Sequence, residues 1–75
     1  MNNEKLFFVF FCVANIAVKL GKRANEAYDA LDKSRLIDSY IIPSYDVLHT
    51  QGKEYIVNDI LDVAKQKGVK LWPQT

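Results

Sequence analysis

Tyr45, Asp46 and His49 are the side chains whose types and spacing could support acid–base chemistry. On a helix, Asp46 can meet His49 at i, i+3 and Tyr45 can meet it at i, i+4. A histidine oriented by a carboxylate can transfer protons near neutral pH. However, the sequence shows no accompanying nucleophile, no glycine-rich phosphate loop and no HExxH pattern. We therefore predict no catalytic site and interpret His49 as a structural hydrogen-bonding residue.

The chain has too few histidine and cysteine residues for a metal site or a disulfide bond. The chain contains one histidine and one cysteine, Cys12, so the usual zinc ligand count cannot be reached and no internal disulfide can form. Cys12 lies in an apolar run, which is typical of a small buried hydrophobe rather than a reactive thiol. The sequence predicts neither a metal site nor a cofactor.

Four tyrosines are many for so small a chain, and three of them fall between residues 40 and 55. Tyrosine is enriched at the energetic centres of protein interfaces, so we hypothesise a partner-binding surface here. Its predicted members are Tyr40, Tyr45, Asp46, His49 and Tyr55. The alternative is that these rings pack at the rim of the core with their hydroxyl groups in water.

Composition indicates one small globular domain over residues 1–75, with 49% hydrophobic and 25% charged residues. The net charge of +1 and the pI near 7.8 make a nucleic-acid partner unlikely, because such domains are usually strongly basic. The apolar run at residues 6–18 is too short for a membrane span. It could be a signal-peptide core, but the leader and cleavage patterns are poor. We expect a cytoplasmic protein with no membrane partner.

Residues 4–20 are predicted to form a helix that ends at Gly21. Two adjacent apolar stripes follow the helical period, and even the remaining face begins apolar. Such a helix is enclosed by its own domain or meets another chain, so we expect a central core helix or a subunit interface. One stripe is Phe7, Phe10, Phe11, Ala14, Ala17 and Val18; the other is Leu6, Val9, Val13, Ile16 and Leu20.

Further helices are predicted at residues 23–33, 35–40, 43–49 and 51–67, with Ser34 and Thr50 as caps of the elements that follow them. Together these patterns predict an all-α fold, a compact single domain of four or five short helices. The short helix after Pro43 is expected to bury Val47 and Leu48. Trp72 is expected to fold back onto the core. The last helix is expected to bury Ile56, Val57, Ile60, Leu61, Val63 and Ala64.

A motif in the second half of the chain resembles a family of short bacterial proteins of unknown function. The motif is Tyr-Ile-Ile-Pro-x-Tyr-Asp-x-Leu-His-Thr-Gln-Gly, followed by Tyr-Ile-Val-x-Asp-Ile, over residues 40–60. Phe8, Phe11 and Cys12 upstream also resemble the family, whereas Ala14 and Arg23 depart from it. Such genes often adjoin one whose product looks like an ADP-ribosyltransferase. The resemblance therefore implies an antitoxin-like or accessory protein.

Three functions are compared on this basis. The leading hypothesis is a protein-interaction module whose partner is another protein, such as the product of the adjacent gene, or a second copy met through the apolar first helix. The alternative is a helix-turn-helix-type DNA-binding protein, which salt-dependent DNA retention would reveal. The third is a small enzyme that uses His49, and only its cluster with Tyr45 and Asp46 supports this hypothesis.

Overall fold

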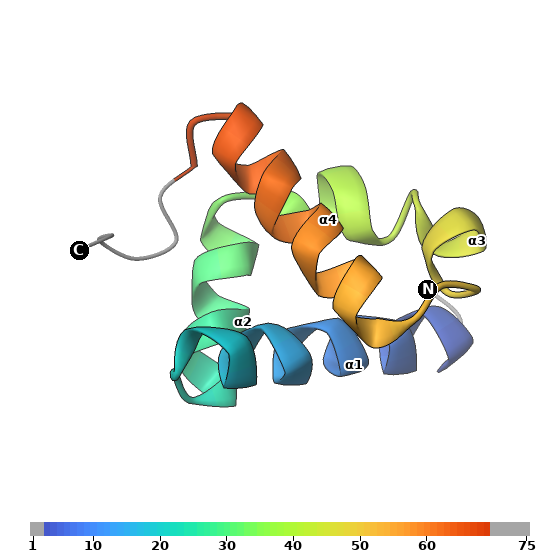
Figure 1. Cartoon of the computed structure of the whole chain (residues 1–75), viewed down its shortest axis with the longest axis horizontal. Coiled ribbons are helices and arrows are strands. Elements are labelled where there is room, and N and C mark those ends of the chain that lie inside the picture. Colours follow the sequence, from blue (N-terminus) through green and yellow to red (C-terminus); the bar gives the residue numbers. More distant parts are fainter. Residues whose placement is uncertain (1–2, 70–75) are drawn as a thin grey trace.

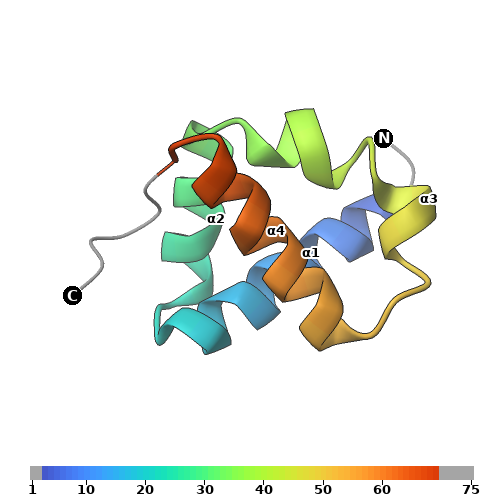
Figure 2. The same ribbon diagram turned by 45° about the horizontal axis from the view of Figure 1, so that its top comes forward.

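Five helical elements make up residues 3–69, the part of the chain that the computed structural model describes (Figure 1). The predicted all-α fold is confirmed, and no strand occurs in this range. α4 lies across α1, with α2 near one end of α1 and α3 near the other (Figures 1 and 2). In chain order the elements are α1 (Asn3–Leu20), α2 (Ala24–Lys33), the π-helical turn η1 (Ile37–Ile41), α3 (Tyr45–Leu48) and α4 (Lys53–Gln66).

The inner face of α1 forms the floor of the core. It packs against both α2 and α4, and Cys12 and Ile16 at its centre are fully buried. The prediction of a core helix is confirmed for this face, and so is the interpretation of Cys12 as a buried hydrophobe. Its buried residues are Phe8, Val9, Cys12, Val13, Ile16 and Ala17.

The opposite face of α1 is apolar but lies in solvent. Phe7 is 68% exposed, Phe10 52%, Phe11 42% and Val18 81%, and Ala14 between them is also exposed. Except at Ala17, which is buried, the expectation of a core helix does not hold for this stripe, and the alternative expectation, a subunit interface, stays a prediction. The stripe is exposed because α2, α3 and α4 all pack on the other side of the helix. We call Phe7, Phe10, Phe11, Ala14 and Val18 the outer face of α1.

A tight turn carries the chain from α1 into α2. Gly21 has a φ of 67°, a left-handed conformation that glycine adopts without strain, so the predicted stop is confirmed. At the start of α2 the Arg23 amide donates to Glu26 Oε1 at 3.0 Å. Ser34 was predicted to begin the next helix, but its hydroxyl donates backward to the Leu31 carbonyl, and Ser34 ends α2.

η1 replaces the ordinary helix expected at residues 35–40. The Ile42 amide donates to the Ile37 carbonyl at 3.0 Å, which is the wider i to i+5 bond of a π-helix. Leu36 and Ile37 are buried as predicted, and Tyr40 is half-buried.

α3 is a single turn, shorter than the predicted 43–49. It buries Leu48, but Val47 is 68% exposed, so its predicted burial is wrong. Thr50 does not cap the last helix either, because its hydroxyl donates back to the Val47 carbonyl. Gly52 takes the capping position of α4 instead. α4 buries Ile56, Val57, Ile60 and Ala64 as predicted, with Leu61 and Val63 partly buried.

Among residues 3–69, no helix combines the length and apolar character needed to cross a membrane. The predicted position of Trp72 lies outside the described residues.

Candidate functional site

An open pocket of about 410 Å³ lies where the first half of α1 meets α3 and the start of α4. Its character is aromatic, with one carboxylate at its edge. We call it the aromatic pocket. It is lined by Glu4, Phe7, Phe8, Phe11, Tyr45, His49, Gln51 and Ile56. The pocket therefore contains two of the five predicted site residues, Tyr45 and His49.

Stacked and edge-on rings form the wall of the pocket. The ring of Tyr45 meets that of Phe8 edge-on, with centroids 5.3 Å apart and an interplanar angle of 79°. On α3 the rings of Tyr45 and His49 stack at 4.4 Å and 9°. On α1 Phe8 and Phe11 are 6.5 Å apart. Both edge-on and stacked pairs at these distances are favourable, so the rings hold one another in place before any partner arrives.

His49 has a structural hydrogen bond. Its Nδ1 lies 2.7 Å from the backbone carbonyl oxygen of Tyr45, which can only accept, so Nδ1 carries the proton and donates it. That nitrogen is therefore bonded to the backbone of its own helix and does not hold Asp46. The pairing with Asp46 that the i, i+3 spacing would allow is therefore not made through Nδ1, and the predicted structural hydrogen bond of His49 is present. Asp46 lies in the first turn of α3 and is exposed.

The Glu4 carboxylate joins the two helices at the edge of the pocket. The Tyr45 hydroxyl donates to Glu4 Oε2 at 3.3 Å, between residues 41 positions apart in the chain. Partial burial raises the pKa of Tyr45, and the charge of Glu4 and this hydrogen bond raise it further. Tyr45 is therefore a neutral hydrogen-bond donor at physiological pH, and Glu4 presents a negative charge beside the aromatic rings.

Tyr40 and Tyr55 belong to a different group. The Tyr40 hydroxyl donates to Asp59 Oδ2 and so ties η1 to α4. Burial first, and then the hydrogen bond and charge of Asp59, raise the pKa of Tyr40 to about 12. Tyr55 precedes Asp59 by one turn of α4 and is 57% exposed. The structure therefore divides the predicted surface between the aromatic pocket and this Tyr40–Asp59 contact.

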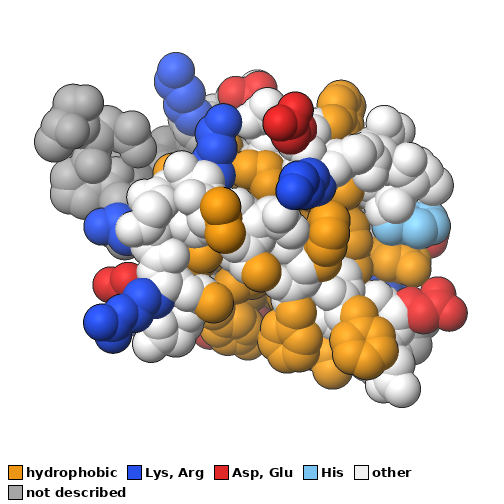
Figure 3. Space-filling view, turned by 60° about the horizontal axis from the view of Figure 1, so that its bottom comes forward, with side chains coloured by type: hydrophobic (Ala, Val, Ile, Leu, Met, Phe, Trp, Pro, Cys, Tyr) orange, Lys and Arg blue, Asp and Glu red, His pale blue; other side chains and the backbone are white. Residues whose placement is uncertain are grey.

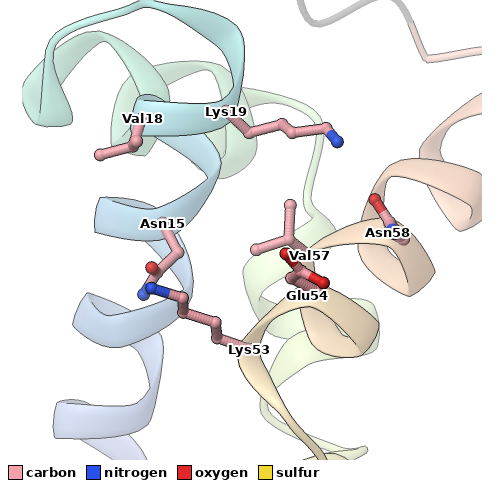
Figure 4. Close-up of a pocket in the computed structure, with 7 residues that line it drawn as sticks. All are labelled: Asn15, Val18, Lys19, Lys53, Glu54, Val57 and Asn58. Carbon is pink, nitrogen blue, oxygen red and sulfur yellow. The ribbon is translucent and has the colours of Figure 1, made fainter.

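A second hollow, of about 320 Å³, runs between α1 and α4 (Figure 4). Lys53 extends from the first turn of α4 toward Asn15 on α1, and Lys19 extends from α1 across the groove (Figure 4). Glu54 adds the opposite charge, and Val18, Val57 and Asn58 complete the lining. With charges of both signs and no ring, this groove has no chemistry focused on one kind of ligand.

The titratable side chains of the described residues do not assemble into a metal site. Within residues 3–69 no three histidine, cysteine, aspartate or glutamate side chains lie close enough to hold a metal ion. The Cys12 thiol is fully buried, and burial raises its pKa to about 12, so it is a protonated, inert group.

The sequence profile of a family described as "Protein of unknown function (DUF3791)" matches residues 7–67. The chain belongs to this family. The match covers α2, η1, α3, α4 and most of α1, and it includes every pocket residue except Glu4. No curated protein and no solved structure matches the chain. The resemblance to a family of unknown function is thus confirmed, whereas the neighbouring gene stays an expectation.

The sequence analysis did not predict the α1 side of the aromatic pocket. Glu4, Phe7 and Phe11 were not among the predicted site residues, although Phe7 and Phe11 are an i, i+4 pair on one helix face. Their spacing was a usable signal for a shared face. What no spacing could show is that α3, about 40 residues later, would place Tyr45 beside them.

Proposed function

We propose that this chain is a protein-interaction module and that the aromatic pocket is its partner-binding site. The observation that supports this is the exposure of Phe7 and Phe11 next to Tyr45, His49 and Glu4 in one open pocket. Aromatic side chains in water carry a free-energy cost that binding removes, and they commonly form the energetic centre of an interface.

The pocket's chemistry defines the partner. Several aromatic rings bind an apolar anchor, and the Glu4 carboxylate at their edge favours a positive charge beside that anchor. A helix or loop of the partner that presents a leucine, methionine or aromatic residue next to an arginine or lysine fits both requirements. The ring stacking already fixes the wall of the pocket, so little ordering is needed on binding.

The product of an adjacent gene is the first partner to test, and the resemblance to proteins encoded beside ADP-ribosyltransferase-like enzymes motivates this choice. In that case the chain acts as the antitoxin-like or accessory member of a pair. Co-expression followed by affinity purification measures the interaction directly. We expect the wild type to retain the neighbour's product.

Variants then locate the surface. Tyr45→Ala removes the ring that bridges α1 and α3, and loss of a tyrosine anchor typically costs about 2 kcal/mol of binding, roughly a thirtyfold loss in affinity. Phe7→Ala tests an exposed pocket residue whose loss should leave folding intact, with Val47→Ala, equally exposed at 68%, as its matched control. Lys65→Ala on α4 is the surface control for Tyr45→Ala.

Two results would count against the proposal. If the wild type retains neither the neighbour nor any protein with the stated chemistry, the interaction function is wrong. If it binds but Phe7→Ala and Tyr45→Ala behave like their controls, binding occurs elsewhere and the pocket assignment is wrong.

A further inference from the structure

The outer face of α1 is an apolar surface that the described part of the chain leaves uncovered. Hydrophobic side chains form a band across the face of the molecule on which α1 lies (Figure 3). The exposed fractions of its three phenylalanines and Val18 correspond to about 500 Å² of apolar surface, given the usual size of such side chains. That is at the upper end of the largest patch found on a typical monomer, about 300–600 Å².

We propose that this face pairs with the outer face of a second copy of the chain, with the two α1 helices antiparallel around a two-fold axis. The proposal goes beyond the partner-binding function above: the two surfaces share Phe7 and Phe11, but Phe10, Ala14 and Val18 belong to the outer face alone. A two-fold interface requires a surface that is complementary to itself. The outer face of α1 has this property in both shape and charge.

Shape complementarity follows from the order of large and small residues. If the axis passes α1 midway between Cys12 and Val13, Phe11 of one copy faces Ala14 of the other, and Phe7 faces Val18. Each large ring then meets a smaller side chain, which allows two helices to approach closely at Ala14. In a parallel pair, each phenylalanine would face its own copy, crowding one half of the helix and leaving a gap at Ala14 and Val18.

Charge favours the same orientation. Glu4 is in the first turn of α1, Lys19 is in its last turn, and Lys22 and Arg23 follow directly. The antiparallel arrangement places Glu4 near the basic C-terminal end of the second copy's α1, whereas a parallel arrangement would place the Glu4 carboxylates of the two copies side by side. Opposed helix dipoles add to this preference.

The area predicts a weak, reversible dimer. Two outer faces contribute about 1,000 Å² of buried surface, and the flanking residues add to this, which is at the lower end of specific interfaces. We therefore expect a dissociation constant between about 10 and 1,000 µM rather than a permanent dimer.

Sedimentation equilibrium from 10 µM to 1 mM protein measures this dimer. The average mass should rise from the 8.6 kDa of one chain toward twice that value. Phe10→Lys should keep the chain monomeric over the whole range and keep the wild-type helical circular dichroism, since Phe10 is half exposed. Tyr55→Lys, an aromatic of similar exposure on α4, should still dimerise. A wild type that is monomeric at 1 mM, or a Phe10→Lys variant that dimerises normally, would overturn the proposal.

A spin label tests the orientation. Attached to Asn3→Cys, an exposed position that the pairing argument does not use, the two labels of an antiparallel dimer should be separated by about 28 Å along the helices, because their positions lie nineteen residues apart at about 1.5 Å each. A parallel pair would bring the labels to within the helix separation of about 8–10 Å. Native Cys12 is fully buried and should not take up label. A label-to-label distance near the helix separation would overturn the antiparallel arrangement. So would the absence of any distance signal that grows with protein concentration.

This inference and the proposed function fail separately. Phe10 belongs to the outer face of α1 but does not line the aromatic pocket. Phe10→Lys should therefore abolish self-association while the co-purified partner is retained. Loss of both in this variant, with folding intact, would show that partner binding requires self-association and that the two proposals do not fail separately.

Discussion

Replacing Ile16 by alanine tests which face of α1 holds the fold together. Ile16 is a fully buried residue of α1, which packs against α2 and α4. The change removes three buried carbon groups at about 0.8 kcal/mol each and leaves a cavity that relaxes only partly. We expect a loss of about 3 kcal/mol in the free energy of unfolding. A chain of this size has about 4–11 kcal/mol in total, so the loss is a large share of its stability.

The assay is urea unfolding followed by far-ultraviolet circular dichroism at a few micromolar protein. With a urea slope near 1 kcal/mol per molar for so small a domain, the midpoint should fall by about 3 M while the slope stays unchanged. Val18→Ala is the matched control, because it shortens a β-branched residue two positions later that is 81% exposed. Its effect should stay within about 0.5 kcal/mol.

The difference between the two variants in the free energy of unfolding tests which face of α1 is buried. If Ile16→Ala and Val18→Ala cost the same, the division of α1 into an inner and an outer face is wrong. If Val18→Ala alone is destabilising at this concentration, the outer face is buried within one copy of the chain. Either result would also remove the basis for pairing through that face.

Three further predictions concern the hydrogen bonds of His49 and Tyr40 and the burial of Cys12. His49→Ala should lower the free energy of unfolding by about 1 kcal/mol, since it removes the hydrogen bond to the Tyr45 carbonyl. Nitrogen NMR of the wild type should show the proton of the neutral imidazole on Nδ1. A proton on Nε2 instead would contradict this hydrogen bond. The hydrogen bond from Tyr40 to Asp59 needs the protonated hydroxyl, and the pKa of Tyr40 is raised to about 12, so the stabilisation is fully present below pH 10 and is lost as pH rises through about 12. Between these pH values the free energy of unfolding should fall more in the wild type than in Tyr40→Phe. Equal losses would show that the contact with Asp59 has no effect. The buried Cys12 thiol should resist a thiol reagent in the folded chain and react fully in urea, and rapid labelling without urea would place it at the surface.

Helical period and punctuation were sufficient for much of the fold. In α4 most aliphatic residues recur at the helical period, so the sequence predicted Ile56, Ile60 and Ala64 as core residues. Gly21 marked the end of α1 because its left-handed backbone suits glycine. The caps were less predictable. Thr50 is a good capping type, but two residues separate it from α4, and its hydroxyl found the nearer Val47 carbonyl.

Only the α3 side of the aromatic pocket could be predicted from the sequence. Tyr45 and His49 are four residues apart, so their stacking follows from helical geometry alone. The contacts of Tyr45 with Phe8 and Glu4, by contrast, join parts of the chain separated by about 40 residues. No local pattern specifies such contacts, because they depend on how α3 docks on α1.

The sequence by itself determined that this protein is helical, where most of its helices end, and that α1 is apolar around most of its circumference. Only the tertiary structure decided which side of α1 is the core. A helix with one apolar face has one way to bury it, but α1 has apolar residues on nearly every side, so its own period leaves the choice open. That choice is made by α2 and α4, which cover Cys12 and Ile16 and leave Phe7, Phe10 and Val18 in solvent.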